Sequence, residues 1–357
     1  MESLDITSNT LLSQYKGKKV FITGHTGFKG SWLTFILDLA GAFTLGYSLK
    51  PNTTPSLYAN LTFSENHKSI IGDIRNNNTL ENAILEFKPN YIFHLAAQPL
   101  VFESYLNPKE NFETNFNGTL NLLEILRKSN LSCSVVLITT DKVYKNSNQN
   151  IPFKESDPLG GNDPYSASKA ATEILIHSYN TSFFLSTDIK IATARAGNVI
   201  GGGDWSEKRI IPDIIRAIFE KQALEIRKPR AIRPWQHVLE PIFGYIALAL
   251  KLDSEPVKYS GSWNFGPNIV DNLSVKSLVE IIEGLKYDLN VSFSDSKTFS
   301  EANFLRLNIE KAKDQLKFVP KWQAKKAIEK TVNWYNGFYN GVSVNELLFR
   351  DINNYLE

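Results

Sequence analysis

A glycine-rich turn directly after the first apolar run restricts the fold of this chain more than any other feature. Lys19 to Thr23 has the pattern of a buried strand, and Gly24, Gly27 and Gly30 then recur at three-residue intervals. Glycine permits a sharp turn, close approach of backbone amides to a pyrophosphate and tight packing of the next helix on the sheet. The helix N-terminus also favours an anion. The pattern predicts a dinucleotide-binding turn, with a bare tight turn as the alternative.

Short apolar runs alternate with helix-length amphipathic stretches through the first half of the chain. This alternation is typical of parallel strands joined by crossover helices. After Gly197 the sequence changes to Gly, Pro, Arg and Trp punctuation and then returns to helical patterns. We therefore predict a Rossmann-type α/β fold, a doubly wound parallel sheet over residues 1–197 completed by a return segment near 235–268, with a smaller C-terminal α/β substrate-binding lobe over 198–357. The predicted strands are Lys19–Thr23, Thr44–Ser48, Tyr91–Ala96, Val135–Thr140 and Lys190–Ala194, and the predicted helices are Gly30–Leu39, Thr79–Phe87, Asn111–Lys128, Ser166–Tyr179, Val275–Leu285 and Lys325–Tyr339.

Composition excludes several other classes of protein. The chain has 357 residues, 42% of them hydrophobic and 21% charged, so it can bury a large core. Its 39 basic and 37 acidic residues leave no overall excess of charge for nucleic acid or a membrane surface. The single cysteine, Cys133, excludes an internal disulfide, and the scattered histidines lack the spacing of metal ligands. Met1 to Gly17 lacks a signal-peptide pattern and no apolar run is long enough to span a membrane, so we expect a cytoplasmic protein without a metal.

Two later segments fit the same dinucleotide. Asp73 follows a further, less clear strand between Thr44–Ser48 and Tyr91–Ala96, where a carboxylate can meet the adenine, and the small residues of segment 95–98 let a nucleotide lie close. The acid that usually ends the second strand and holds the ribose is missing, because residues 47–50 read Tyr-Ser-Leu-Lys. This leaves NAD and NADP both open. The cofactor-binding residues predicted in these segments are Gly24, Thr26, Gly27, Phe28, Lys29, Gly30, Asp73, Ile74, Leu95, Ala96, Ala97 and Gln98.

Tyr165 and Lys169 lie one helical turn apart on one face of a predicted helix. A lysine so placed lowers the pKa of the phenol and orients the nicotinamide ribose, so Tyr165 can accept an alcohol proton during hydride transfer, and both residues join the predicted cofactor site. The spacing alone is weak, because the Tyr/Lys pairs at 15/19 and 105/109 share it. Only Tyr165 lies in an apolar-patterned helix far downstream of the glycine turn.

The strand before that helix ends in Thr140, Asp141 and Lys142. A threonine at the carboxyl end of a strand can hydrogen-bond a substrate alcohol, since ligands of doubly wound sheets bind at that edge. Asp141 and Lys142 add an acid and a potential base, which a plain reductase does not need; the alternative is a solvated turn. Lysine serves as a base only if its pKa falls, and a dry site beside the positive charge of an oxidised cofactor lowers it.

Seven segments carry a more specific signal, and they are GHTGFKGSWL (Gly24 to Leu33), LAAQPLV (Leu95 to Val101), TTDKVY (Thr139 to Tyr144), DPYSASK (Asp163 to Lys169), ARAGNVIGGGDW (Ala194 to Trp205), RPWQHVLEP (Arg233 to Pro241) and WNFGP (Trp263 to Pro267). In this order they resemble the extended short-chain dehydrogenase/reductase family, and within it the nucleotide-sugar 4,6-dehydratases that act on CDP-glucose. The resemblance implies NAD as the cofactor, a nucleotide-sugar as the substrate and a homodimer built from two helices of each subunit.

The resemblance also implies a reaction. Tyr165 takes the C4 hydroxyl proton while the C4 hydride passes to NAD, with Thr140 holding the hydroxyl and Lys169 stabilising the phenolate. Lys142 then removes the acidified C5 proton, Asp141 protonates the departing C6 hydroxyl, and the hydride returns to C6. The product is a 4-keto-6-deoxy sugar nucleotide.

By the same resemblance, the contacts to the nucleotide-sugar lie mainly in the second lobe. Arginine suits a diphosphate because its planar fork donates hydrogen bonds in pairs. Trp205 has a core position as its alternative, Arg227 and Arg230 have the pattern of surface residues, and Trp263 and Phe265 that of core residues. The predicted substrate-binding residues are Gln98, Ser104, Asn198, Asp204, Trp205, Arg209, Arg216, Arg233 and Gln236.

Phe102 departs from the family pattern, which has an arginine there, so any substrate contact at that position is in doubt. Three other functions stay open. One is dehydration of another nucleotide-hexose, such as UDP-N-acetylglucosamine. Another is sugar-nucleotide epimerisation, which needs no acid or base beyond the tyrosine, lysine and threonine. The third is a catalytically silent dinucleotide-binding regulator, against which the complete set of Thr140, Tyr165 and Lys169 stands.

Overall fold

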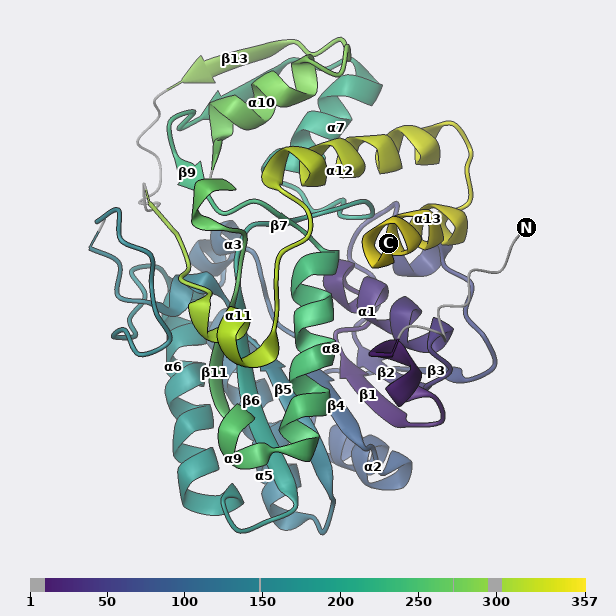
Figure 1. The fold of residues 1–357 in the computed structure, drawn as a ribbon, viewed down its shortest axis with the longest axis vertical. Coiled ribbons are helices and arrows are strands. Elements are labelled where there is room, and N and C mark those ends of the chain that lie inside the picture. The colour runs from purple at the N-terminus through teal and green to yellow at the C-terminus, as the bar shows by residue number, and fades with distance from the viewer. Residues whose placement is uncertain (1–9, 148, 272, 295–303) are drawn as a thin grey trace.

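The computed structural model describes residues 10–147, 149–271, 273–294 and 304–357, so the first nine residues of the segment screened for a signal peptide lie outside it. At its centre is a sheet of seven parallel strands in the order β11-β6-β5-β4-β1-β2-β3 (Figure 1). The chain order reverses between β1 and β4, which is where doubly wound sheets bind ligands. This confirms the predicted Rossmann-type sheet. Its strands are β1 (Lys19–Thr23), β2 (Phe43–Ser48), β3 (His67–Ile71), β4 (Tyr91–His94), β5 (Cys133–Ile138), β6 (Ile189–Ala196) and β11 (Gly261–Phe265).

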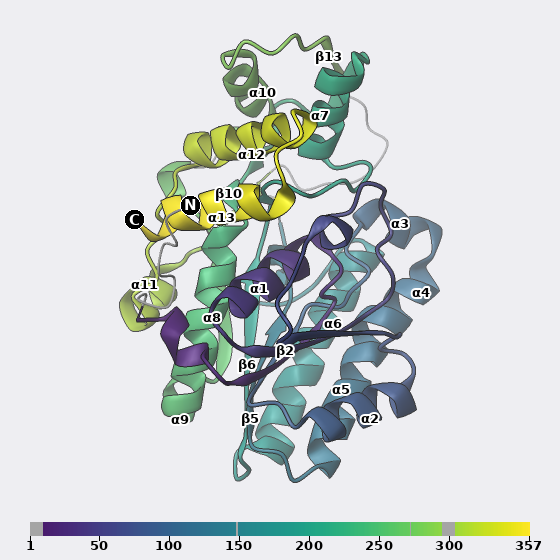
Figure 2. The same ribbon diagram turned by 90° about the vertical axis from the view of Figure 1, so that its right-hand side faces the viewer.

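Helices cover both faces of the sheet, and each face has its own apolar core. Helices α1 and α8 pack together on one face, and α2, α5 and α6 pack on the other (Figure 2). Leu33 and Leu248 belong to the first core, and Leu122 and Ile176 belong to the second. A strand covered on both faces is apolar throughout, as in β5, where all six residues are buried. The helices are α1 (Phe28–Leu39), α2 (Asn77–Phe87), α3 (Val101–Leu106), α4 (Pro108–Phe112), α5 (Gly118–Lys128), α6 (Pro164–Tyr179), α7 (Ile210–Glu220), α8 (Leu239–Ser254), α9 (Pro256–Tyr259), α10 (Val275–Glu283), α11 (Glu310–Leu316), α12 (Ala324–Tyr339) and α13 (Val344–Leu356).

The predicted helix Asn111–Lys128 is wrong as a continuous α-helix. A π-helical turn over Glu113–Asn117 separates α4 from α5. The backbone carbonyl of Asn115 in this turn accepts hydrogen bonds from the hydroxyls of Thr119 (2.7 Å) and Thr172 (3.1 Å). A single wide turn barely disturbs the apolar periodicity, so the pattern alone did not indicate it.

The sheet is completed by segments that follow residue 197. Strand β11 pairs with β6, with Phe265 opposite Ala196, and α8 packs against β5 and β6. The sequence analysis predicted no helix at α8, because 11 of its 16 residues are buried and such a helix has no polar face to reveal its period. The division of the chain at residue 197 stays a prediction.

The second lobe, at the top of Figure 1, contains α7, α10, α12 and α13. Its interior holds an aromatic cluster in which the Trp205 ring lies 5.8 Å from both Trp334 and Tyr335 and 5.0 Å from Phe338, between ring centroids. Its short strands form three two-stranded sheets, and these strands are β7 (Val199–Ile200), β8 (Leu224–Arg227), β9 (Ile232–Arg233), β10 (Gln236–His237), β12 (Leu273–Ser274) and β13 (Val291–Ser294).

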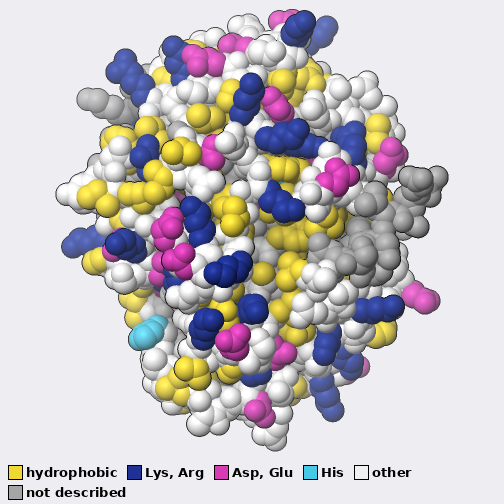
Figure 3. Space-filling view, viewed as in Figure 1, with side chains coloured by type: hydrophobic (Ala, Val, Ile, Leu, Met, Phe, Trp, Pro, Cys, Tyr) yellow, Lys and Arg dark blue, Asp and Glu magenta, His cyan; other side chains and the backbone are white. Residues whose placement is uncertain are grey.

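The molecular surface agrees with the nearly balanced charge of the sequence. Acidic and basic side chains are interspersed over the face seen in Figure 3, where no large region of one sign stands out. None of the helices in the described ranges is both long and apolar enough to cross a membrane.

Candidate active site

Gly24 and Gly30 occupy positions where no side chain fits. Gly24 has a φ of +74°, and a Cβ there would lie 2.7 Å from the Ala96 nitrogen. A Cβ on Gly30 would lie 2.0 Å from the carbonyl oxygen of Gly24. Helix α1 starts directly after this turn, and no described side chain caps its N-terminus at Gly27. The first amides of the helix are therefore left to an external acceptor, so this turn fits the pyrophosphate of a dinucleotide.

The other predicted cofactor residues lie along the same strand ends, and their side chains have partners within the chain. The Thr26 hydroxyl hydrogen-bonds the Ser48 hydroxyl at 2.9 Å and donates to the Leu49 carbonyl at 2.8 Å, which ties the turn to the end of β2. Asp73 forms an ion pair with Arg75 at 2.6 Å, and the hydrogen bonds that its carboxylate accepts from Arg75 lower the pKa of that carboxylate. A ribose or adenine group reaching Asp73 would therefore meet a carboxylate that already has a cationic partner.

Lys29 is directed toward the predicted catalytic residues. Burial, together with the nearby charges of Arg209 and Lys169, lowers the pKa of its ammonium to about 8, whereas Asp141 opposes that shift. Its Nζ lies 5.9 Å from the centroid of the Tyr245 ring on α8. The glycine turn and the catalytic strand end thus share one electrostatic environment.

The strand end at β5 brings Thr140, Asp141 and Lys142 together. The Thr140 hydroxyl donates to Asp141 Oδ1 at 3.0 Å, and Lys142 Nζ lies 3.8 Å from the same oxygen. Asp141 is fully buried, and its Oδ2 has no hydrogen-bond partner in the part of the chain that the structure describes. The Lys142 side chain is 26% exposed. A buried carboxylate, that of Asp141, and a partly exposed amine, that of Lys142, therefore lie side by side.

Tyr165 and Lys169 project from the first turns of α6, which Asp163 caps by accepting from the Ser166 amide. Burial raises the pKa of Tyr165 to about 12, and a hydrogen bond with Thr140 and the charge of Arg209 oppose the rise. Burial lowers the pKa of Lys169 to about 8. The net pKa shift of the phenol is therefore opposite to the expected one, because loss of water outweighs the neighbouring positive charges.

Thr140 and Tyr165 are neighbours in the structure, as predicted from their positions at the end of a strand and the start of a helix. Lys169 Nζ donates to the Ile138 carbonyl at 3.3 Å, which ties α6 to the last residue of β5. Of the pairs with the same spacing, Tyr15 is buried far from this edge and donates to the Ile246 carbonyl, and Tyr105 lies 38% exposed on α3. Only the pair in α6 meets the strand end.

A buried ion pair that the sequence analysis missed lies beneath this site. Glu173, one turn after Lys169 on α6, accepts two hydrogen bonds from the Arg195 guanidinium, at 2.9 and 2.8 Å, and another from the Thr139 hydroxyl. Burial raises the pKa of Glu173, but the bonds and charge of Arg195 outweigh it and lower the pKa overall. Arg195 also donates to the Tyr144 hydroxyl at 2.8 Å. The network therefore holds both ends of segment 139–144, which carries three of the predicted catalytic residues.

Glu173→Gln is expected to destabilise the protein by about 3 to 5 kcal/mol, because it leaves a buried guanidinium without its counter-charge. Glu173 and Arg195 are 2% and 3% exposed. Urea unfolding monitored by tryptophan fluorescence measures the loss. As a control, Glu280→Gln removes an exposed pair with Lys276 at 3.7 Å and should change the unfolding free energy by less than about 1 kcal/mol. Equal effects of the two substitutions would contradict the assigned role.

Asn115 is a second residue of the site that the sequence analysis did not single out. Its Oδ1 accepts a hydrogen bond from the backbone amide of Gln98 at 2.9 Å, and its Nδ2 donates to the Ser168 hydroxyl at 2.9 Å. Gln98 Oε1 in turn accepts from Asn111 Nδ2 at 2.8 Å. These bonds join the segment leaving β4 to α6. An asparagine inside a helical pattern is a poor helix former, and that was the available signal.

Among the predicted substrate-binding residues, Arg209 and Arg216 form ion pairs with aspartates. Asp204 and Arg209 form an ion pair at 3.0 Å, and the charge of Arg209 reaches Tyr165, so this pair borders the catalytic residues. Arg216 pairs with Asp213 and donates to the Trp205 carbonyl at 3.1 Å. Arg233 lies in β9, which pairs with β12, and Asn198 follows β6 at a left-handed φ of 43°.

Ser104, Trp205 and Gln236 are buried in the structure. The Ser104 hydroxyl donates to the Val101 carbonyl at 2.6 Å, and Ser104 is fully buried. Trp205 is 6% exposed within the aromatic cluster of the second lobe, which is the core position kept as its alternative. Gln236 is 1% exposed. The core roles predicted for Trp263 and Phe265 and the surface positions predicted for Arg227 and Arg230 are confirmed.

Phe102, which departs from the family pattern, makes a contact between the two lobes. Lys208 Nζ lies 3.2 Å from the centroid of the Phe102 ring. Phe102 belongs to α3, and Lys208 lies in the loop before α7. The family pattern has an arginine at this position. In this chain the position carries an aromatic ring, and that ring attracts a lysine of the second lobe.

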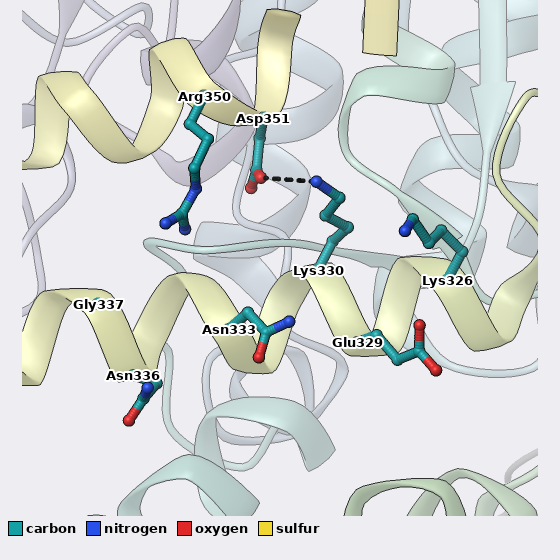
Figure 4. A pocket seen from close by; sticks show the side chains of 8 residues that line it. All are labelled: Lys326, Glu329, Lys330, Asn333, Asn336, Gly337, Arg350 and Asp351. Atoms are coloured by element: carbon teal, nitrogen blue, oxygen red, sulfur yellow. Dashed lines mark ion pairs between the residues drawn. The ribbon is translucent and has the colours of Figure 1, made fainter. Parts of the chain in front are cut away.

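A separate groove of about 370 Å³ lies between α12 and α13 and contains none of the predicted site residues. Figure 4 shows the Asp351 carboxylate directed toward Lys330, and the two charged atoms lie 3.7 Å apart. Burial raises the pKa of Asp351 to about 6, although Lys330 opposes the rise. The groove is therefore a place where stability depends on pH.

Asp351→Asn is expected to flatten part of that pH dependence. Since the folded pKa of about 6 lies above the ordinary 3.8, the contribution of Asp351 to stability is full below the unfolded value and is lost as the pH rises through the folded one. At about 1.4 kcal/mol for each pKa unit, the fall in the parent amounts to about 2 to 3 kcal/mol relative to the variant. Urea unfolding of both proteins at about pH 3.5 and at about pH 7, roughly the two sides of this window, measures it. Parallel pH profiles would contradict the shift.

Comparison with known proteins agrees with this architecture. A family model described as GDP-mannose 4,6 dehydratase matches residues 21–331. CDP-glucose 4,6-dehydratase of Salmonella typhimurium is 42% identical over 348 residues, which is 96% of this chain and 97% of that protein. The structure of an epimerase from Methanothermobacter thermautotrophicus has a TM-score of 0.82 at 24% identity and covers 93% of this chain and 96% of that one.

A second solved structure, dTDP-glucose 4,6-dehydratase from Bacillus anthracis in complex with NAD, has a TM-score of 0.75 at 23% identity and covers 91% of this chain and 98% of that one. The two structural likenesses bear on the fold, which they confirm. The family model covers most of the chain, and the Salmonella relative is aligned over nearly its full length. The chain therefore belongs to the GDP-mannose 4,6 dehydratase family.

Proposed function

We propose that this chain is an NAD-dependent nucleotide-sugar 4,6-dehydratase that converts CDP-D-glucose to CDP-4-keto-6-deoxy-D-glucose and water. The meeting of Thr140, Asp141, Lys142, Tyr165 and Lys169 at one sheet edge, beside the glycine turn, carries the proposal. The 42% identity to a CDP-glucose 4,6-dehydratase supports the choice of substrate. An epimerase would use only part of this set, because it has no water to eliminate.

Bound NAD would supply the hydride acceptor and donor for a transfer within the sugar, from C4 to C6. The glycine turn and the uncapped start of α1 suit its pyrophosphate. Lys169 and Tyr165 would lie beside the nicotinamide ribose, and segment 95–98 along the adenosine side. The bound cofactors named for related structures support NAD rather than NADP.

The residues of the chain divide the proton transfers between them. Burial raises the pKa of Tyr165 and the charge of Arg209 only opposes the rise, so the positive charges of Lys169 and of bound, oxidised NAD would complete the stabilisation of the phenolate. In that form Tyr165 accepts the C4 hydroxyl proton while Thr140 holds that hydroxyl. The new ketone acidifies C5, and Lys142 takes the C5 proton. Asp141 gives a proton to the leaving C6 hydroxyl, so one water departs. The C5 position is reprotonated as the hydride returns, and no net oxidation results.

The decisive experiment offers the purified protein CDP-, dTDP-, UDP- and GDP-hexoses with NAD and measures loss of water by mass spectrometry. We expect dehydration of CDP-glucose. An isomer of unchanged mass would establish an epimerase instead. Dehydration of the other sugars with none of CDP-glucose would overturn the substrate while leaving the chemistry standing.

We further propose a homodimer formed through the α3, α4 and α6 face. These three helices contact one another and expose the apolar side chains of Leu106 (59%), Phe112 (38%) and Ile174 (59%). Exposed apolar residues on helices that pack together favour association. Sedimentation equilibrium of the parent and of Ile174→Glu tests this surface.

We also propose a cytoplasmic location, since a single cysteine suits a reducing compartment. We further propose a division of the chain into a cofactor domain and a substrate lobe near residue 197.

A further inference from the structure

Gly197 directly follows β6 and lies against the carboxylate of Asp141. A Cβ on Gly197 would lie 1.7 Å from Asp141 Oδ2 and 2.1 Å from its Cγ. Both distances are far inside van der Waals contact, so no side chain fits at 197 while Asp141 keeps its position. The φ of Gly197 is outside the left-handed region, so the backbone does not itself require glycine here. The three atoms nearest to such a Cβ all belong to the Asp141 carboxylate, which accounts for the missing side chain.

The Asp141 carboxylate is held from two sides. Its Oδ1 accepts the Thr140 hydroxyl at 3.0 Å, and its Oδ2 faces Gly197 without a donor among the described residues. A buried oxygen without a donor is costly, so this orientation persists only because the surroundings exclude others. The backbone wall at Gly197 and the Thr140 hydroxyl together select it.

Gln236 fixes the position of that wall. Its Nε2 donates to the Gly197 carbonyl at 3.1 Å and to the Phe265 carbonyl at 3.0 Å, which joins the ends of β6 and β11. The next residue, Asn198, has a left-handed φ of 43°, which is uncommon for a residue other than glycine. The backbone at Gly197 therefore cannot withdraw easily to admit a side chain.

We propose that Gly197 is a positioning residue for Asp141: its missing side chain is the space that the carboxylate occupies, and Gln236 keeps that space at a fixed width. The proposal rests on the proposed function, in which Asp141 protonates the departing C6 hydroxyl. A methyl group at 197 displaces the carboxyl from the leaving group. Tyr165 and Lys169 are carried by α6 and keep their places, so the oxidation of C4 survives.

The kinetic test compares Gly197→Ala with Gly266→Ala. Gly266 follows β11 as Gly197 follows β6, because Phe265 pairs with Ala196, and a Cβ there would meet Leu307 at an ordinary 3.5 Å. With CDP-glucose, Gly197→Ala should slow loss of water by roughly 10²- to 10⁴-fold, the usual contribution of a general acid. Reduction of NAD in a single turnover and deuterium exchange at C5 should stay near the parental rates. Gly266→Ala should change none of these, and parental loss of water by Gly197→Ala overturns the proposal.

A stability cycle tests the same contact without any substrate. Urea unfolding midpoints are measured for Gly197→Ala and Gly266→Ala in the parent and in Asp141→Ala. We expect Gly197→Ala to lower the midpoint in the parent, or to prevent folding, and to cost no more than Gly266→Ala once Asp141 is alanine. An equal cost in both backgrounds shows that Gly197 does not seat Asp141. Should the parent dehydrate no nucleotide-sugar, the proposed function fails, and this cycle still decides the contact.

Discussion

Tyr165→Phe is expected to reduce dehydration of CDP-glucose to the limit of detection, a loss at the upper end of the roughly 10²- to 10⁴-fold range for a general base. The substitution removes one hydroxyl and keeps the ring, which is 8% exposed and packed beside Thr140. Binding of the nucleotide should change little, because the residues predicted to bind its diphosphate are other ones. Steady-state turnover and calorimetric titration with CDP separate the two effects.

The tyrosines with the same spacing to a lysine provide the controls. Tyr105→Phe alters a partly exposed residue of α3 and should keep full turnover. Tyr15→Phe removes a buried hydrogen bond to the Ile246 carbonyl, so it should lower stability and leave the rate unchanged. Near-normal turnover by Tyr165→Phe, or an equal loss in either control, would remove Tyr165 from the mechanism.

Lys142→Ala should separate oxidation from dehydration. Tyr165, Lys169 and Thr140 remain, so the first hydride transfer continues, whereas removal of the C5 proton loses its base. Reduced cofactor should accumulate on mixing with CDP-glucose in single-turnover conditions. Deuterium exchange from solvent into C5 should fall by roughly 10²- to 10⁴-fold.

Lys142→Arg distinguishes a base from a structural cation. Arginine keeps a positive charge beside Asp141, where Lys142 Nζ lies 3.8 Å away, but does not give up its proton at accessible pH. Loss of exchange in both variants therefore identifies Lys142 as the base. Rescue by arginine, or exchange at the parental rate in Lys142→Ala, would mean that the side chain only stabilises the turn, whose backbone bond from the Lys142 amide to Thr140 is unaffected by either change.

Local patterns sufficed to predict the elements that repeat a simple rule. Strand β1 occupies the predicted residues Lys19–Thr23. The turn after it needs glycine at two positions because a Cβ at either would collide with backbone atoms. The side chains of Thr140 and Tyr165 could be expected to meet, since a strand end and the next helix start share one edge of a parallel sheet. The family match confirms the resemblance that the seven segments indicated.

Features that depend on distant segments could not be read from one stretch of sequence. Helix α8 escaped prediction because it is buried almost all round. The Glu173–Arg195 pair joins α6 to β6, and neither residue has a local motif. The pKa of Tyr165 was expected to fall because Lys169 is near in sequence, but burial by the whole site raises it. Gly197 was noticed only as a boundary, since its role involves a carboxylate 56 positions away in the chain numbering.

The late arrival of β11 in the chain has a consequence for synthesis. Six strands of the sheet are complete by Ala196, but β6 stays an open edge until Gly261–Phe265 pairs with it. An unpaired edge of buried, apolar residues is prone to join strands of other chains. The nascent polypeptide therefore exposes an unpaired, aggregation-prone strand edge while the stretch from β7 to α9 is still being translated. We expect chaperones to bind the nascent chain mainly in that interval.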